Sequence, residues 1–433
     1  MGSDGSGSKN YVLITADGHA GASIRDYKPY LAKQFHGEFE EWAKDFHDPW
    51  ADFDKDLSDT DDEGLRIGVS SASSPYNWES AERVTILEGQ GVVAEVIFPN
   101  TVPPFYPSGA VTAPSPTNDE EYRLLWAGVQ AHNRWLVDFC NDAPGRRAGL
   151  AQVFLTNLDD AIAEVKWAKE NGLKGVIVPA DHQCSIVNLY ERRLDPFWKA
   201  CSDYGMPVHR HSAGVGPPET EETGPAAIAI GVYETQLFFQ RTLPHLMVGG
   251  VFERFPDLQF VMTETGAAWI PPELNRLDWS VKLGAQKGHM AYPLYHRAVE
   301  NMKKLPSEHW HKNMYVAPSL AVRKDLDALD AIGADRIMWG NDYPHHEGSF
   351  PHNRLAVRLL FHDIPEDKVR QMTSLNAAKL YGFDLEMLQK IADRVGPTVA
   401  EVATPVAPHE LPTVSFSHTV GEAIAANKVL VAA

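Results

Sequence analysis

The chain has 433 residues, of which 44% are hydrophobic and 22% charged, a composition typical of one large soluble globular domain with insertions. Its formal net charge of −19 argues against a nucleic-acid-binding surface, because neutralising phosphates requires an excess of Lys and Arg. Three widely separated cysteines (Cys140, Cys184 and Cys201) exclude a disulfide framework and a thiolate metal site. The sequence shows neither a leader-like segment nor an apolar run of membrane length, which predicts a cytoplasmic protein.

Short apolar strands alternate with amphipathic helices along most of the chain. The predicted strands occupy residues 11–15, 94–98, 150–154, 175–179, 206–209, 258–263, 314–317 and 336–339. The predicted helices occupy residues 122–139, 158–169, 195–204, 269–283, 324–332, 354–361 and 366–381. This alternation predicts βαβ units in an α/β fold, and eight parallel strands are enough to close a (β/α)8 TIM barrel. A doubly wound open sheet is the alternative, but no Gly-x-Gly-x-x-Gly follows the first strand.

Three segments fall outside this alternation. Residues 1–9 form a flexible N-terminus, and residues 384–433 form a C-terminal extension, part helical and part Pro-rich, of a kind that often wraps a neighbouring subunit. Within the barrel of residues 10–383, an insertion at about 20–90 is rich in aromatic residues between Tyr27 and Phe53. We interpret this insertion either as a cover over the barrel mouth that lines a pocket or as a surface cap that serves packing only.

Acidic residues and histidines follow the predicted strands at the positions where a barrel presents its active site. The predicted metal ligands are Asp17, His19, His209, His211, Glu264, Asp342 and His345. Imidazole and carboxylate without thiolate suit Zn²⁺, Mn²⁺ or Fe²⁺, with one or two ions per chain. Because residues at i and i+2 of an extended chain point to the same side, Asp17 with His19 and His209 with His211 are each expected to act as a bidentate pair.

The residues around Asp342 leave several roles open. His345, His346 and Glu347 either support the ligands, face the substrate or form an ordinary loop. Two arginines, Arg83 and Arg210, either bind a substrate carboxylate or hold a structural one in place.

Several motifs together resemble the metal-dependent amidohydrolase superfamily, specifically its amidohydrolase 2 branch with the aminocarboxymuconate-semialdehyde decarboxylase-like enzymes. The resemblance runs from residue 11 to about residue 383, and its motifs lie at residues 17–19, 78–83, 131–135, 207–211, 263–271, 340–345 and 376–381.

The resemblance implies metal ligands at Asp17, His19, His211 and Asp342. The sequence departs from many relatives at Glu264, where a histidine is usual, and in the additional His209. No lysine of the kind that is carbamylated in relatives follows the fourth strand. Glu264 and His209 therefore either hold a second metal ion, or Glu264 is an acid/base group.

Three reactions suit such a site, and the predicted catalytic residues are Asp342, Glu264 and His211. The first expectation is hydrolysis of an amide, ester or thioester by a metal-activated water that gives its proton to Asp342. The second is non-oxidative decarboxylation of an aromatic or unsaturated carboxylate, with an acid that protonates the substrate carbon. The third is oxygenation at a dinuclear non-haem iron centre. A non-enzymatic binding role ranks fourth.

The expected substrate is a fairly large and largely apolar small molecule. The predicted substrate-binding residues are Trp42, Trp50, Trp78, Arg83, Phe105, Tyr106, Arg210 and His346. The family resemblance implies a homodimer.

Overall fold

The computed structural model describes residues 9–47, 77–100, 103–107, 115–180, 187–212, 220, 222, 224 and 226–432. Seven parallel strands form one curled sheet in the order β1-β2-β3-β4-β5-β6-β7. They are β1 (Leu13–Ala20), β2 (Val92–Pro99), β3 (Arg147–Gln152), β4 (Gly175–Ile177), β5 (Val208–His211), β6 (Phe260–Thr263) and β7 (Met314–Ala317). Because all neighbours are parallel, the C-terminal ends of the strands meet at one edge, as the predicted TIM-barrel architecture requires.

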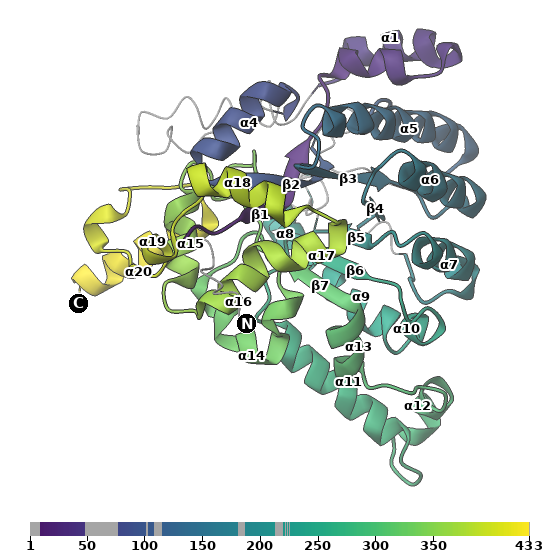
Figure 1. Ribbon diagram of the computed structural model, residues 1–433. Helices are drawn as coiled ribbons and strands as arrows, with labels where there is room; N and C mark the ends of the chain where they lie inside the picture. The colour runs from purple at the N-terminus through teal and green to yellow at the C-terminus, as the bar shows by residue number, and fades with distance from the viewer. Residues whose placement is uncertain are drawn as a thin grey trace, which may run out of the picture.

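Helices connect consecutive strands and cover the outside of the sheet. The α-helices are α1 (His36–Asp45), α4 (Ser80–Gly89), α5 (Asp119–Asn141), α6 (Leu158–Glu170), α7 (Asp195–Asp203), α8 (Ala226–Gln240), α9 (Thr242–Leu246), α10 (Val251–Arg254), α11 (Ile270–Gly284), α12 (Tyr292–Val299), α13 (Pro306–Asn313), α14 (Leu329–Ile332), α15 (Asn353–Phe361), α16 (Glu366–Arg370), α17 (Asn376–Tyr381), α18 (Leu385–Val395), α19 (Val399–Val402) and α20 (His418–Ala432). Shorter 3-10 or π-helical turns are η1 (Ile24–Tyr30), η2 (Lys33–Phe35), η4 (Arg192–Leu194), η5 (Arg323–Ala328), η6 (Ala334–Arg336), η7 (Gln371–Leu375) and η8 (Pro408–Glu410). The helices α5, α6 and α7 lie side by side outside the strands β2 to β5 (Figure 1).

The predicted eighth strand is an extended segment without a regular ladder. It makes one parallel bridge to β7, between Val316 and Ile337, and one to β1, between Gly18 and Tyr343. Between these bridges, the amide of Asn341 donates to the side-chain hydroxyl of Thr15 at 2.9 Å, where a regular strand would use a backbone carbonyl. The segment thus lies between β7 and β1 and completes the barrel, but its hydrogen bonds are too irregular to form a strand.

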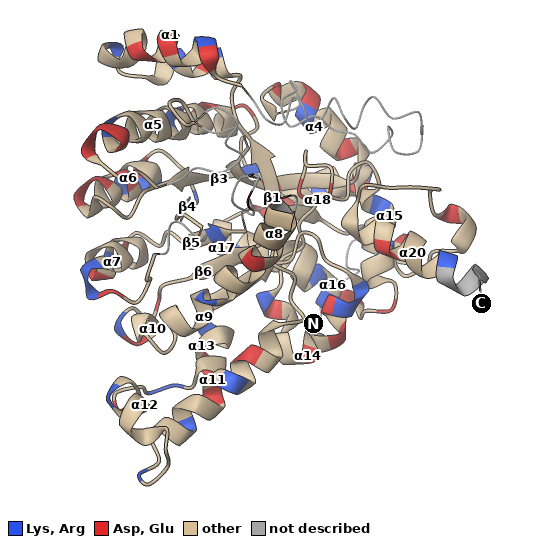
Figure 2. Ribbon diagram, turned by 180° about the vertical axis from the view of Figure 1, so that it is seen from behind, with Lys and Arg blue, Asp and Glu red and all other residues tan. Residues whose placement is uncertain are grey.

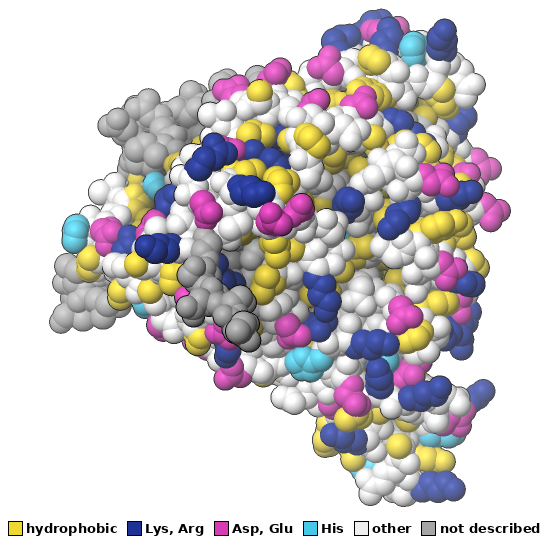
Figure 3. Space-filling model, viewed as in Figure 1, with side chains coloured by type: hydrophobic (Ala, Val, Ile, Leu, Met, Phe, Trp, Pro, Cys, Tyr) yellow, Lys and Arg dark blue, Asp and Glu magenta, His cyan; other side chains and the backbone are white. Residues whose placement is uncertain are grey.

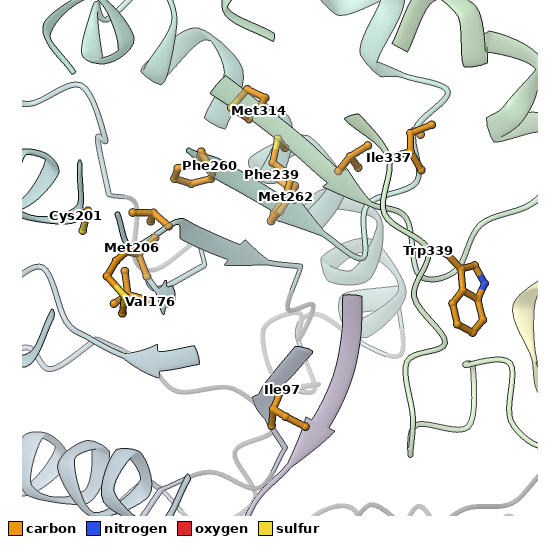
Figure 4. Packing of buried hydrophobic residues seen from close by; sticks show 14 of the residues in the cluster. Ile97, Val176, Cys201, Met206, Phe239, Phe260, Met262, Met314, Ile337 and Trp339 are labelled. Atoms are coloured by element: carbon orange, nitrogen blue, oxygen red, sulfur yellow. The ribbon is translucent and has the colours of Figure 1, made fainter. Parts of the chain in front are cut away.

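Strand residues alternate between two hydrophobic layers. Phe260 and Met262 of β6 and Met314 of β7 belong to the large cluster between sheet and helices (Figure 4). Val261 and Tyr315, on the opposite face of the same strands, belong to a second cluster that fills the barrel interior. Full burial of a side chain of this size contributes roughly 1.5–3 kcal/mol, so the alternation fixes the strand register.

The described part of the aromatic insertion packs against α5. Phe39 is fully buried in a cluster with Ala127 and Ala131 of α5. The indole N–H of Trp42 donates to the carbonyl of Tyr106 at 2.8 Å, which ties α1 to the loop after β2. These contacts are of the kind expected if the insertion is a surface cap that serves packing. Residues 48–76 of the insertion, including Trp50, lie outside the described residues.

The C-terminal extension packs onto its own chain. Leu388 and Ala392 of α18 join the interior cluster, so that α18 closes the barrel end opposite the active-site edge. Further along the extension, α20 packs on α15 through Val420 and Ile424, which are buried with Ala356 (Figure 1). Charged residues lie mostly on helices and loops rather than on strands (Figure 2). None of the helices described is long and apolar enough to cross a membrane.

Candidate metal centre

The strand β1 carries a bulge at the site. Its register with β2 shifts between Thr15 and Gly18, and the Thr15 hydroxyl donates to the carbonyl of Asp17 at 2.7 Å. A bulge re-aims the side chains of the strand that contains it. As a result, Oδ1 of Asp17 lies 3.1 Å from Nε2 of His19, and both residues are buried.

Two other strand ends bring further ligating groups to this pair. His211 is the last residue of β5, and its Nε2 lies 3.2 Å from Oδ1 of Asp17. The amide of Asp342 donates to the carbonyl of Asp17 at 2.9 Å, and Oδ1 of Asp342 lies 3.1 Å from Nε2 of His19. The backbone pairing of β1 with the segment that follows Ile337 therefore places the Asp342 carboxylate in the same site.

Several buried polar atoms at the centre of the site have no hydrogen-bond partner among the residues that the structure describes. Nε2 of His19 is close to two carboxylates but is in hydrogen-bond geometry with neither, and Oδ2 of Asp17 and of Asp342 also lacks a partner. Leaving such a group unpaired costs about 1–3 kcal/mol or more for a charge. Atoms that converge without bonding one another are the arrangement expected around a cation.

The described residues contain three groups that fit a metal ion. They are Asp17 with His19 and His211, His19 with Asp342 and His345, and Glu264 with Asp342 and Glu347, and the ligand atoms within each group lie within 4.8 Å of one another. Imidazole and carboxylate donors suit a divalent transition metal. Two of the groups share His19 and two share Asp342, so the groups form one continuous centre.

The charges of the site also favour a bound cation. Burial raises the pKa of Glu264, and the neighbouring carboxylates of Asp342, Asp17 and Glu347 raise it further. Burial also lowers the pKa of His19, but Asp17 and Asp342 outweigh this effect and hold that pKa well above its usual value. Carboxylates this close cannot all be ionised without a compensating positive charge, which a proton or a metal ion can supply.

His345 lies between two oxygen atoms. Its Nδ1 is 2.9 Å from Oδ1 of Asp342, and its Nε2 is 2.8 Å from Oδ1 of Asn100, directly after β2. Its ring centroid is 4.0 Å from that of His19. His345 thus borders the centre and would become a ligand by exchanging one of these contacts for a metal ion.

His209 lies outside the centre, and the expected bidentate pair of His209 and His211 is wrong. Nδ1 of His209 is 3.0 Å from the carbonyl of Val176, and Nε2 is 2.8 Å from the hydroxyl of Tyr381 on α17. Two residues along a regular strand advance by about 6.6 Å, which places His209 one layer deeper in the barrel than His211. The bulge in β1 removes this separation for Asp17 and His19, and β5 has no such bulge among the pairings described.

The predicted substrate-binding arginines both have protein partners. The Arg83 guanidinium binds Glu95 at 2.7 Å, and Arg147 binds the same carboxylate at 3.1 Å. Arg83 therefore holds a structural carboxylate, the second of the two roles considered. Arg210 is fully buried, and its guanidinium donates to the carbonyl of Pro179 and, at 3.1 Å, to the hydroxyl of Thr242.

The predicted aromatic residues lie in several environments. Trp42 contacts Phe105, with ring centroids 5.9 Å apart, and Tyr106 is fully buried. Trp78 is partly buried against the large core cluster. The ring of His346 is buried and faces Phe416 of the C-terminal extension.

Sequence reasoning left the role of Glu347 open and did not single out Asn100. Glu347 follows Asp342 by five residues in the same loop, and Asn100 directly follows β2 at the active-site edge. Position at a strand end was the available signal for Asn100. Sequence spacing alone does not show that the Glu347 carboxylate approaches Glu264, because the two residues are distant in the chain.

Comparison with known proteins relates this chain to an amidohydrolase family. The model of a family described as "Amidohydrolase" matches residues 99–383. The chain is 25% identical over 222 residues to a gamma-resorcylate decarboxylase of a Polaromonas species, a match that spans 49% of this chain and 64% of that relative.

Among solved structures, an amidohydrolase from Mycobacterium avium subsp. paratuberculosis matches with a TM-score of 0.58 at 21% identity, over 86% of this chain and 100% of that one. A 5-carboxyvanillate decarboxylase from Novosphingobium aromaticivorans, complexed with manganese and 4-hydroxy-3-methoxy-5-nitrobenzoic acid, matches with a TM-score of 0.59 at 16% identity, over 86% and 97% of the two chains. At these identities the structural matches establish the fold.

Proposed function

The chain belongs to the amidohydrolase family, and from this premise we propose that it is a metal-dependent decarboxylase of a hydroxylated aromatic carboxylate. One observation carries the proposal: Asp17, His19 and Asp342 each place a buried atom without a hydrogen-bond partner among the described residues in the same site as His211, as a metal centre requires. The gamma-resorcylate decarboxylase relative supports this reaction over the hydrolysis ranked first from the sequence. Neighbouring structures with bound manganese make Mn²⁺ the metal to test first.

The residues at the site have separate roles in this reaction. Asp17, His19, His211 and Asp342 would hold the metal ion, which when bound supplies a positive charge for the substrate carboxylate and an adjacent hydroxyl. Glu264 has a side chain that is 17% exposed, whereas that of Asp342 is fully buried. Glu264 therefore faces the space open to a substrate and would donate a proton to the ring carbon as the bond to the departing CO₂ breaks. The electron pair of the broken C–C bond forms the new C–H bond.

The test uses the purified protein with Mn²⁺ and a panel of hydroxybenzoates that includes 2,6-dihydroxybenzoate and 5-carboxyvanillate. We expect CO₂ release and, in D₂O, one deuterium at the carbon that carried the carboxylate. Glu264→Gln should slow turnover by about 10²–10⁴-fold while Mn²⁺ remains bound, because it removes only the acid. Asp342→Asn should remove both Mn²⁺ binding and turnover with the fold intact. Ester or amide hydrolysis without any decarboxylation in the panel would reject the proposal in favour of a hydrolase.

The group of Glu264, Asp342 and Glu347 favours a second candidate, a dinuclear oxygenase. These three carboxylates could hold a second ion beside the first, with Asp342 shared between the two. Elemental analysis of protein purified without added metal separates the candidates. Two irons per chain together with substrate-dependent O₂ consumption would support the oxygenase, and one ion per chain would reject it.

A further inference from the structure

The C-terminal extension contacts the active-site edge of the barrel at two loops. The backbone amide of His418 donates to the carbonyl of Glu347 at 2.8 Å. The hydroxyl of Thr419 donates to the carbonyl of Ala321, in the loop after β7, at 2.7 Å. One short stretch of the extension therefore holds the loops that follow β7 and the eighth barrel segment.

The contact of Phe416 with His346 adds an aromatic packing to these hydrogen bonds. The two rings are 6.2 Å apart at an interplanar angle of 62°, an edge-to-face arrangement. His346 is only 2% exposed and directly precedes Glu347. The extension thus contacts two consecutive residues of the loop that leads from Asp342.

This stretch is itself firmly placed. His418 is the first residue of α20, and the amide of Gly421 donates to the carbonyl of Ser417 at 2.7 Å. Val420 is fully buried with Ile424 against α15, which fixes the start of the helix. The extension lies beyond residue 383, where the match to the family ends, so the family resemblance assigns it no role.

Glu347 needs such support because it belongs to an acidic group. Its carboxylate lies within 4.8 Å of ligand atoms of Glu264 and Asp342, and like charges at this distance repel one another. One carboxylate oxygen of Asp342 in this group is buried and has no hydrogen-bond partner in the described part of the chain. The carboxylates repel one another, so other contacts must hold the loop that brings Glu347 close to Glu264 and Asp342.

We propose that residues 416–420 support the metal centre from outside it, and that the amide of His418 positions Glu347 for metal binding. The proposal rests on the metal site of the proposed function and adds Glu347, which lies beside Asp342, to the ligands assigned there. His418 acts only through its backbone, so it is a positioning residue, and its exposed side chain has no part in this role.

A pair of substitutions at His418 isolates the hydrogen bond. His418→Pro removes the N–H, and proline is well tolerated at the first residue of a helix because its fixed φ suits that position. His418→Ala retains the N–H and serves as the matched control. The Mn²⁺ dissociation constant is measured by calorimetry on protein treated with a chelator. The same titration of Glu347→Gln shows which Mn²⁺-binding step is weakened when the Glu347 carboxylate is lost. We expect His418→Pro to weaken that step by about tenfold or more, as loss of a contact that orients a ligand usually does, and His418→Ala to leave it unchanged.

Hydrogen exchange of the metal-free protein gives an independent measurement. Amides of residues 343–350 should exchange faster in His418→Pro than in His418→Ala, while the urea midpoints of the two variants stay equal. Equal exchange or equal Mn²⁺ affinity in the two variants would overturn the proposal. Wild-type protein that binds no Mn²⁺ would also overturn the proposal. If the two variants still differed clearly in hydrogen exchange, the error would lie in the metal site of the proposed function and not in the hydrogen bond from His418 to Glu347.

Discussion

Glu264 and Asp342 both have left-handed backbone conformations, with φ of 59° and 56°. Such conformations are uncommon for residues other than glycine and cost of order 1–3 kcal/mol each, so the surrounding structure must enforce them. For Asp342, the enforcing contact is the hydrogen bond from its amide to the carbonyl of Asp17. For Glu264, it is the hydrogen bond from its amide to the carbonyl of Ala317. The same backbone turns aim both carboxylates into the candidate metal centre.

A buried histidine away from the metal centre predicts how stability depends on pH. Nδ1 of His132 lies 2.8 Å from the hydroxyl of Tyr27, and burial lowers the pKa of His132 to about 3. The unfolded chain binds a proton at this histidine below about pH 6.5, whereas the folded protein does not bind it until about pH 3. The resulting stability is present above pH 6.5 and is lost as the pH falls toward 3. By this linkage, wild-type protein should lose about 2 kcal/mol more than His132→Gln between pH 7.5 and pH 5.

The measurement for His132 is urea unfolding of both proteins at the two pH values with a chelator present. The difference between the proteins at pH 7.5 gives the packing cost of the substitution, and only the change of this difference with pH tests the histidine. Parallel pH dependences of the two proteins would contradict the prediction.

At the scale of elements, the close approach of α5 to the loop after β2 decides where Phe105 and Tyr106 lie. A Cβ atom added at Gly128 of α5 would lie 2.1 Å from the carbonyl oxygen of Pro104. Because this oxygen belongs to the backbone, it can move away only if the whole loop moves. Tyr106, two residues further on, packs with Val129 of the same helix. Glycine at residue 128 is therefore what allows this loop to rest directly on the helix.

Gly128→Ala should destabilise the protein by about 1–3 kcal/mol, because it overpacks this contact. The matched control is Gly37→Ala in α1, where an added Cβ meets no atom of the described residues within 4 Å. That control should gain about 0.5–1 kcal/mol from improved helix propensity. Thermal or urea unfolding checks both variants, and a gain for Gly128→Ala would show that the loop does not rest on α5 in solution.

At the scale of the whole molecule, charged side chains are arranged differently on the visible surface and at the barrel mouth. On the face seen in Figure 3, acidic and basic side chains alternate with hydrophobic ones. Among the described residues, four acids lie close together at the barrel mouth: Asp17 and Asp342 are buried, and Glu264 and Glu347 are partly buried. A ligand that neutralises these carboxylates in the folded state, and binds the unfolded chain weakly, must stabilise the entire fold.

Metal removal should therefore lower the stability of the protein. With free Mn²⁺ at a hundred times its dissociation constant, the stabilisation amounts to about 2.7 kcal/mol. The unfolding midpoint should fall on treatment with a chelator and recover when Mn²⁺ is added, as scanning calorimetry can follow. The midpoint of Asp342→Asn should not rise when Mn²⁺ is added. A wild-type midpoint that changes with neither the chelator nor Mn²⁺ would count against the metal centre.

The sequence by itself determined the layer structure of the protein. Alternation of short apolar runs with amphipathic segments predicted seven of the strands within a few residues, because burial on both faces and helix periodicity are local properties. The same reading located Asp17, His19, His211, Glu264, Asp342 and His345 at the active-site edge, since parallel strands bring their C-terminal ends together.

Only the tertiary structure decided which of these residues share a centre. His209 and His211 look alike in the sequence, but Tyr381 of α17 binds the deeper one and leaves the other at the mouth. The eighth segment owes its irregular pairing to the Thr15 hydroxyl, and Glu347 owes its place to a loop contacted by His418. Each of these outcomes depends on a hydrogen bond between residues more than seventy positions apart, and local sequence patterns carry no information about such pairs.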